Sequence, residues 1–343
     1  GLNVQNAITA AVANSATEVN VYFAGGTYTT TNQISIVSIK IPVKFSGGYL
    51  GTADNSFERS ESETVFKRVT YNIRFIRAAS LPSLVIDGIT FQGGYVSGGG
   101  ARGGAIYLDA STTSISNCVF HSNGFQNTAK DSRNNSSTVS GGGAVGAVTS
   151  GSLTLDDCTF TGNRHVLGGS YNQGYGAAVF GYSVSLNIKN CVFEKNYMDG
   201  SAGRNTLFGG AVSTLYGSLS IKNCEFSGNY IKGAIYDHGG AFGGAIAVRD
   251  AKSFVMTDSI FSDNYVANPS DRIRIYTAGI LFLEDWKSGD GVTTSIIERC
   301  VFDSRKVPNS VKSSSANVTL YAQSDILLTG GSLFMTNNLI YGS

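Results

Sequence analysis

Proline and charged residues are scarce in this sequence. Only 4 of its 343 residues are proline and 14% are charged, whereas glycine is abundant at 43 residues. The formal net charge of +1 provides no strongly basic surface, so nucleic acid is not expected as a partner. No apolar run approaches the ~20 residues that a membrane-spanning helix needs. Membrane insertion of this chain is therefore not expected.

The chain also lacks the short motifs that hold metals, phosphates or nucleophiles. It contains no CxxC pair, no HExxH, no nucleophile elbow, no EF-hand loop and no glycine-rich loop between a strand and a helix. We therefore expect neither a metal site nor a cofactor.

The five cysteines recur at one position of a repeat instead of forming pairs. An odd number of cysteines at one repeat position is a poor basis for disulfides or for zinc. Free cysteine is usually buried and behaves as a small apolar residue. We predict an inward column of thiols, with Ser259 in the same position of the one repeat that lacks cysteine; the column comprises Cys118, Cys158, Cys191, Cys224 and Cys300.

The repeat itself is clearest at residues 209–230, GGAVSTLYGSLSIKNCEFSGNY. It begins with GGA and an aliphatic residue and ends with Phe-x-x-Asn. Its openings lie at Gly103–Ile106, Gly142–Val145, Gly176–Val179, Gly209–Val212 and Gly243–Ile246, with a degraded copy at Ala278–Ile280. Its closing pairs are Phe120/Asn123, Phe160/Asn163, Phe193/Asn196, Phe226/Asn229 and Phe261/Asn264, and Phe302 lacks the asparagine.

Alternation within each repeat changes phase at two adjacent polar residues. Leu219 and Ile221 alternate, Lys222 and Asn223 interrupt, and Cys224 then resumes the pattern. This predicts a corner, and hence three short strands per repeat. Stacked turns lie ~4.8 Å apart and would align the phenylalanines inside and the asparagines at a corner, in left-handed backbone geometry.

The predicted fold class is therefore all-β, a right-handed single-stranded parallel β-helix of the pectate-lyase-like type, with nine or ten rungs. Residues 3–14 have helical spacing and predict a short N-terminal capping helix. We expect one domain over 1–343. It would comprise a cap at 1–18, first rungs at 19–102, the GGA/FxxN repeats at 103–306 and final rungs at 307–343.

The paired motifs, GGA[I/V] and Phe-x-x-Asn, resemble the repeat of the chlamydial polymorphic outer-membrane proteins and related bacterial surface proteins. The similarity covers residues 103–264, and no membrane barrel follows in this sequence. It implies a parallel β-helix displayed at the bacterial cell surface or secreted, often as an adhesin. The expected partners are then an extracellular glycan or a host or matrix protein.

Repeats vary mainly between the closing asparagine and the next GGA, in segments that leave from one corner. These segments are predicted to project from one edge of the solenoid as binding loops. Tyrosine, arginine and histidine suit contacts with sugars or with a protein partner. The candidate ligand-binding residues are Arg164, His165, Tyr171, Tyr175, Arg204, Tyr236, His238, Arg274 and Tyr276.

The first strand of the repeats predicts a second apolar surface. Its outward positions are expected to hold Tyr107, Phe180, Tyr182, Leu215 and Leu281. An apolar sheet face of this kind is either covered by neighbouring loops or forms the floor of a binding groove.

A polysaccharide lyase or glycoside hydrolase remains the alternative, because many parallel β-helices have such activities. The adjacent Asp156 and Asp157 lie at a repeat corner and are expected to be solvated. A second outward position of the first strand is expected to hold Asp109, Val148, Tyr182, Leu215, Arg249 and Leu283 on successive rungs. The acidic Asp109 and the basic Arg249 would then lie several rungs apart, too far to share one substrate bond. The remaining catalytic candidates are Asp237, His238, Arg272 and Arg274, with histidine as the proton carrier.

Overall fold

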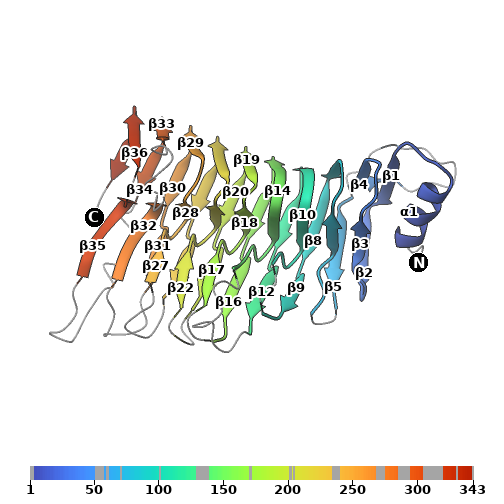
Figure 1. The fold of residues 1–343 in the computed structure, drawn as a ribbon, viewed down its shortest axis with the longest axis horizontal. Helices are drawn as coiled ribbons and strands as arrows, with labels where there is room; N and C mark the ends of the chain where they lie inside the picture. The colour runs from blue at the N-terminus through green and yellow to red at the C-terminus, as the bar shows by residue number, and fades with distance from the viewer. Residues whose placement is uncertain are drawn as a thin grey trace.

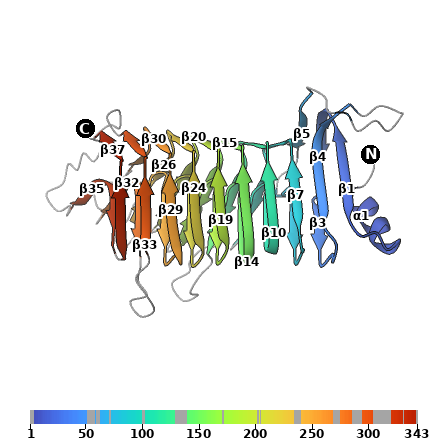
Figure 2. The same ribbon diagram turned by 90° about the horizontal axis from the view of Figure 1, so that it is seen from above.

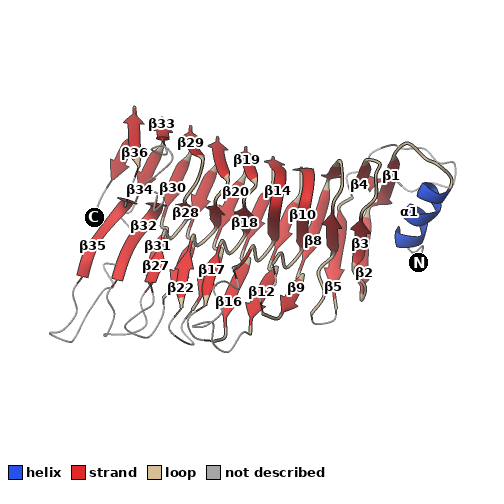
Figure 3. Cartoon of the chain, viewed as in Figure 1, coloured by secondary structure: helices blue, strands red, loops and turns tan. Residues whose placement is uncertain are grey.

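The chain forms a rod of stacked coils, with its single described helix, α1 (Val4–Ala13), at the N-terminal end (Figures 1 and 3). The computed structural model describes residues 4–50, 58, 62–69, 72–99, 102–128, 139–169, 172–200, 203, 205–233, 240–267, 275–284, 294–303, 320–329 and 331–341. Named strands pair in parallel with their counterparts on adjacent rungs. The protein is thus a right-handed parallel β-helix, as the sequence predicts.

Sheet A, of 17 strands, contains two columns side by side. Column A1 follows each GGA motif and contains β3 (Ile34–Val37), β6 (Ile76–Ala79), the first halves of β10 (Ile106–Ser116) and β14 (Val145–Asp156), β18 (Val179–Tyr182), β23 (Val212–Leu215), β28 (Ile246–Arg249), β32 (Ile275–Glu284) and β35 (Leu320–Leu328). Column A2, seen in Figure 2, contains β1 (Val19–Ala24), β4 (Val43–Tyr49), β7 (Leu84–Asp87), the second halves of β10 and β14, β19 (Ser185–Lys189), β24 (Ser218–Lys222), β29 (Ser253–Thr257), β33 (Thr294–Glu298) and β36 (Ser332–Thr336).

Sheet B has ten strands, one for each rung, and contains the phenylalanine of each closing motif. Its strands are β2 (Gly26–Thr30), β5 (Thr64–Arg68), β8 (Ile89–Gln92), β11 (Val119–His121), β15 (Thr159–Thr161), β20 (Val192–Glu194), β25 (Glu225–Ser227), β30 (Ile260–Ser262), β34 (Val301–Asp303) and β37 (Leu339–Tyr341). Ten rungs agree with the predicted number.

The excursions, expected as loops, contain two further sheets. Sheet C begins with β9 (Tyr95–Ser97), which follows Gly94. Its other strands follow the closing asparagines and are β12 (Gly124–Asn127), β16 (Arg164–Leu167), β21 (Tyr197–Asp199), β26 (Tyr230–Lys232) and β31 (Tyr265–Ala267). Sheet D precedes each GGA motif and contains β13 (Ser140–Gly141), β17 (Gln173–Tyr175), β22 (Thr206–Phe208) and β27 (Gly240–Phe242). Among the described residues, four excursions therefore leave through sheet C and return through sheet D, along the same margin of the rod.

Three apolar layers result from this arrangement. The main core fills the coil between sheets A and B. A second core lies between sheets C and D and includes Met198, Leu207 and Ile231. A third lies between sheet D and the outer face of column A1 and includes Phe180 and Phe208. Sheet D therefore buries both of its faces.

The predicted phenylalanine column is confirmed in sheet B. Successive rings from Phe120 to Phe261 stack with centroids 4.7 Å apart and planes within 5°. Each of these rings is fully buried. Burial of one such side chain contributes about 1.5–3 kcal/mol, so the column is a large part of what holds the rungs in register.

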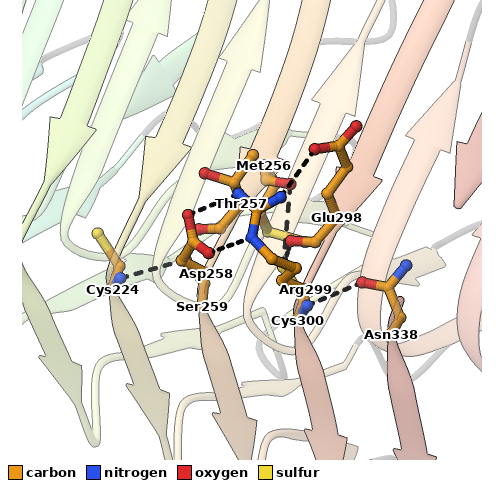
Figure 4. Close-up of polar contacts among 9 residues, drawn as sticks. All are labelled: Cys224, Met256, Thr257, Asp258, Ser259, Glu298, Arg299, Cys300 and Asn338. Atoms are coloured by element: carbon orange, nitrogen blue, oxygen red, sulfur yellow. Dashed lines mark hydrogen bonds and ion pairs between the residues drawn. The ribbon is translucent and has the colours of Figure 1, made fainter. Parts of the chain in front are cut away.

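The cysteine column is also confirmed, and all five thiols are free and buried. Burial is the largest cause of the raised pKa of Cys118. Ser259 occupies the same position and accepts a hydrogen bond of 3.1 Å from the backbone N–H of Cys224 (Figure 4). On the rung after Cys300, Asn338 accepts a bond of 2.8 Å from the backbone N–H of Cys300 (Figure 4). Small polar residues can therefore replace cysteine in this column.

The closing asparagines form a buried amide ladder. Asn196 Nδ2 donates to Asn229 Oδ1 and to the Phe160 carbonyl, both at 2.9 Å. The expectation of left-handed geometry at the asparagine itself is wrong, because the positive φ falls on the residue before it, as at Lys195 with φ 51°. Placing that turn one residue earlier directs the amide inward, where it bonds its copies.

The two glycines of the GGA motif have separate roles. Gly142 has φ +72°, which an L side chain rarely adopts. A Cβ on Gly143 would lie 2.1 Å from the Ala177 carbonyl oxygen and 2.3 Å from that of Arg164. The second glycine therefore allows the chain to pass close to sheet C as it re-enters the main coil.

Candidate ligand-binding face

The outer face of sheet C presents one long side chain on almost every rung. The strand register aligns Tyr95, Gly124, Arg164, Tyr197, Tyr230 and Tyr265. Arg164 is exposed and the four tyrosines are partly exposed. We call Tyr95, Arg164, Tyr197, Tyr230 and Tyr265 the tyrosine row. It runs parallel to the axis of the rod.

Rings in this row stack on one another. The centroids of Tyr197 and Tyr230 lie 5.2 Å apart with planes at 7°, and those of Tyr230 and Tyr265 lie 5.1 Å apart at 6°. Burial is the largest cause of the raised pKa of Tyr230, followed by its two tyrosine neighbours and Asp199. Because the inner ring faces are occupied by neighbours, this part of the row offers solvent its ring edges and phenol hydroxyls.

Glycine at position 124 allows the side chains of Arg164 and Tyr95, on the rungs to either side of it, to meet. The Arg164 guanidinium carbon lies 5.5 Å from the centroid of the Tyr95 ring, two rungs away. A Cβ on Gly124 would lie 2.9 Å from Arg164 Cγ and 3.1 Å from the Tyr95 ring. Glycine at this rung therefore leaves the space in which arginine and tyrosine meet.

Polar side chains flank the row on the same face of sheet C. Gln126 Oε1 accepts a hydrogen bond of 2.7 Å from the Tyr95 hydroxyl. Lys232 Nζ and Asp199 Oδ2 form an ion pair at 3.3 Å, one rung apart. The charges on this flank therefore cancel, and Arg164 is the cation that remains on the row.

Two of the predicted ligand residues are buried instead of exposed. The side chain of His165 points between sheets C and D, where its Nε2 lies 3.2 Å from Ser140 Oγ. Burial lowers the pKa of His165 to about 3, so the imidazole is neutral at pH 7. Tyr175 is fully buried between sheet D and column A1. Alternation along each short strand places these side chains inward and their neighbours outward.

Of the other predicted residues, Arg164 alone has a described side chain, and it is exposed as expected. Tyr276 lies in β32, where its backbone pairs with Tyr321 of β35. The remaining candidates lie outside the described residues, and they are Tyr171, Arg204, Tyr236, Asp237, His238, Arg272 and Arg274.

The outward apolar face of column A1 is covered by sheet D. Phe180 and Leu215 contribute to the third core, as the first of the two alternatives expects. The prediction that Leu281 and Leu283 face outward is wrong, because both side chains lie in the main core. The register pairs Ile246 with Leu281 and Arg249 with Glu284. The degraded repeat is shifted by one residue relative to the predicted alignment, and such a shift exchanges the two faces of a strand.

That register brings Arg249 and Glu284 together as an ion pair. Arg249 Nη1 also donates to the Tyr175 hydroxyl at 2.5 Å, and its guanidinium carbon lies 4.2 Å from the Phe208 ring centroid. The side chains of Arg249 and Glu284 are only 16% and 10% exposed. Asp109, in the same outward slot, is four rungs from Arg249. The cluster is therefore internally satisfied and forms no acid–base pair with Asp109.

A hollow of about 670 Å³ lies beside α1 at the N-terminal end of the rod. Phe23, Phe66 and Phe75 contribute apolar walls, and residues 29–33 form a polar rim. The residues lining the hollow include no charged side chain. It therefore provides no carboxylate, histidine, lysine or arginine for catalysis.

The sequence contains a signal for the tyrosine row, although the excursions were predicted to be loops. A tyrosine directly follows the closing asparagine in three repeats, at Tyr197, Tyr230 and Tyr265. Repetition at one corner predicts alignment on successive rungs. From the sequence these tyrosines appear only at the start of variable segments, because strands of three residues have no visible alternation.

Searches against protein-family models, curated proteins and solved structures found no match for this chain. The part of the chain that the structure describes contains no cluster of three histidine, cysteine, aspartate or glutamate side chains suited to a metal ion. None of its described helices has the length and apolarity required to cross a bilayer. The fold and the exposed row define the class, a parallel β-helix with an ordered aromatic and cationic face.

Proposed function

We propose that the protein is an adhesin-like binding protein of the bacterial cell surface or extracellular space, which recognises a glycan or a host or matrix protein through the outer face of sheet C. The observation that supports this most directly is the tyrosine row, which extends across successive rungs on a rigid scaffold. Tyrosine gives large contact area at low entropic cost, and arginine is enriched among the residues that carry binding energy. The resemblance of the repeats to bacterial surface proteins supports the same function.

Polysaccharide lyase or hydrolase activity is the competing outcome. Hydrolysis requires two carboxyl groups across one glycosidic bond. The catalytic candidates, Asp237, His238, Arg272 and Arg274, lie outside the described residues. Among the described residues, Arg249 already forms an ion pair with Glu284 and a hydrogen bond with the Tyr175 hydroxyl. Binding is therefore the function that the described geometry supports best.

The test is a binding screen of the full chain against arrayed glycans and extracellular matrix proteins. Replacement of Tyr197, Tyr230 and Tyr265 by serine is expected to weaken binding of any retained ligand at least tenfold. A matched variant, with serine at Val119, Val192 and Ile260, changes three outward positions of sheet B. It is expected to change affinity less than twofold.

Circular dichroism of both variants checks that the fold is retained. Unchanged binding in the tyrosine variant, or release of new reducing or unsaturated ends from arrayed polysaccharides, would contradict the proposal. The second result would favour the enzyme.

A further inference from the structure

We infer that the tyrosine row takes an unbranched, neutral, β-1,4-linked glycan in extended form, lying parallel to the axis with about one sugar per rung. This inference rests on the proposed function and specifies the ligand of the same face. It depends on three features of the row: its spacing, the groups that it exposes and its balance of charge.

The spacing excludes an extended peptide as the periodic partner. The row repeats every 5.1–5.2 Å between stacked rings. Side chains on one face of an extended peptide repeat every ~6.6 Å, so a peptide would lose register within about three rungs. Successive sugars of an extended β-1,4-linked chain advance by nearly one rung. Such a chain stays in register with the row, and because its sugars alternate in orientation, equivalent groups meet the row on every second rung. An α-1,4-linked chain instead coils away from the row.

The exposed groups suit sugar hydroxyls better than sugar faces. Tyr230 is stacked on both sides, by Tyr197 and by Tyr265. Its hydroxyl and ring edge therefore carry the contact, and a phenol can both donate and accept a hydrogen bond. Lys232 and Asp199 add a donor and an acceptor beside the row. Equatorial hydroxyls of a flat glycan chain can meet both lines of polar groups.

The charge favours a neutral glycan over a polyuronate. A polyuronate carries one carboxylate per sugar and needs cations on many rungs. Lys232 is paired with Asp199, so Arg164 is the remaining cation on the described face of sheet C from β9 to β31. A single cation on this face compensates only one such carboxylate.

The experiment is calorimetric titration of the full chain with cellohexaose and chitohexaose, with maltohexaose and hexagalacturonate as comparisons. At least one of the first two is expected to bind, with affinity rising from the dimer to about the hexamer. Tighter or equal binding of maltohexaose would contradict the linkage, and equal binding of hexagalacturonate would contradict neutrality.

Phenylalanine variants test the contact itself. Tyr230→Phe keeps the ring stack and removes one hydroxyl, and it is expected to weaken hexamer binding about fivefold. Tyr182→Phe changes a partly exposed tyrosine of column A1, outside the row, and is expected to have no effect. Equal effects of the two variants would overturn the inference.

Two outcomes separate this inference from the proposed function. If neither hexamer binds but a matrix protein binds through the tyrosine row, the glycan inference fails and the proposed function stands. If neither a glycan nor a protein binds through the row, both fail.

Discussion

The asparagine of each closing motif satisfies all of its polar atoms inside the protein. Asn196 Oδ1 accepts from the backbone N–H and from Nδ2 of Asn163, while its own Nδ2 donates to Asn229 and to the Phe160 carbonyl. All three asparagines are fully buried. Because Asn163, Asn196 and Asn229 bond copies on both sides, no other side chain has to supply a partner for these amides.

Replacement of one ladder residue should therefore be costly. Asn196→Ala takes away the acceptor of the Asn163 backbone N–H and the Nδ2 donor to the Phe160 carbonyl. Each buried group left without a partner costs about 1–3 kcal/mol. We expect a loss of about 3–5 kcal/mol in the free energy of unfolding, measured by urea denaturation. Asn223→Gly is the control, because it removes one exposed amide bond at a position of φ 52°. A comparable loss in both variants would contradict the role of the ladder.

His165 gives the molecule an acid-sensitive position. Burial holds its pKa at about 3 in the folded chain, against about 6.5 when unfolded. Between these values the unfolded chain binds a proton that the folded chain does not, so the free energy of unfolding falls as pH falls from 6.5 toward 3.

The matched variant is His165→Met, because Met198 occupies the equivalent position on the next rung. The stability of the wild type relative to this variant should fall by about 2.5 kcal/mol between pH 7 and pH 4.5. Urea midpoints at the two pH values measure the change. A difference that does not depend on pH would show that the imidazole is protonated within the fold.

At the scale of elements, α1 covers the end of the main core. Ile8 is fully buried in that core, and Val4 and Ala11 pack against it. Gln5 Oε1 accepts a hydrogen bond of 2.8 Å from the backbone N–H of Ser35 in β3. The helix therefore shields the first rung, whose strand edges would otherwise be open to pairing with another chain.

A charged side chain on the buried face of α1 should detach the helix from the first rung. Ile8→Asp is expected to reduce the thermal midpoint and to increase light scattering on heating, because an unpaired carboxylate cannot be buried cheaply. Val12→Asp, on the same helix, is the control, since Val12 is 41% exposed. Equal scattering from the two variants would mean that α1 does not protect the rung.

At the scale of the whole molecule, the two ends of the rod differ. The N-terminal end carries α1, whereas inward positions of the last rung are exposed. Ile340 is 51% exposed and pairs in register with Phe302, which is fully buried. Each rung of a solenoid depends on its neighbours for burial. The last rung therefore has less packing energy than the rungs in the middle.

Most of the main coil can be predicted from the sequence. Phenylalanine, cysteine and asparagine each recur at one position of a repeat, and that recurrence by itself requires stacked columns in any solenoid. Alternation on either side of Lys222 and Asn223 predicts the corner, and Asn223 has the positive φ that the corner needs. The candidate site was harder to predict, since strands such as β21 and β26 have three residues and show no period.

The sequence by itself therefore determined the rung, because residues repeated at a fixed position define their own neighbours. Only the tertiary structure decided which excursion residues face outward, because sheets C and D are strands only through pairing with their copies on adjacent rungs. That pairing buries His165 and Tyr175 and aligns Tyr197, Tyr230 and Tyr265 on the surface. The candidate ligand-binding face thus arises from contacts between rungs, which no single repeat contains.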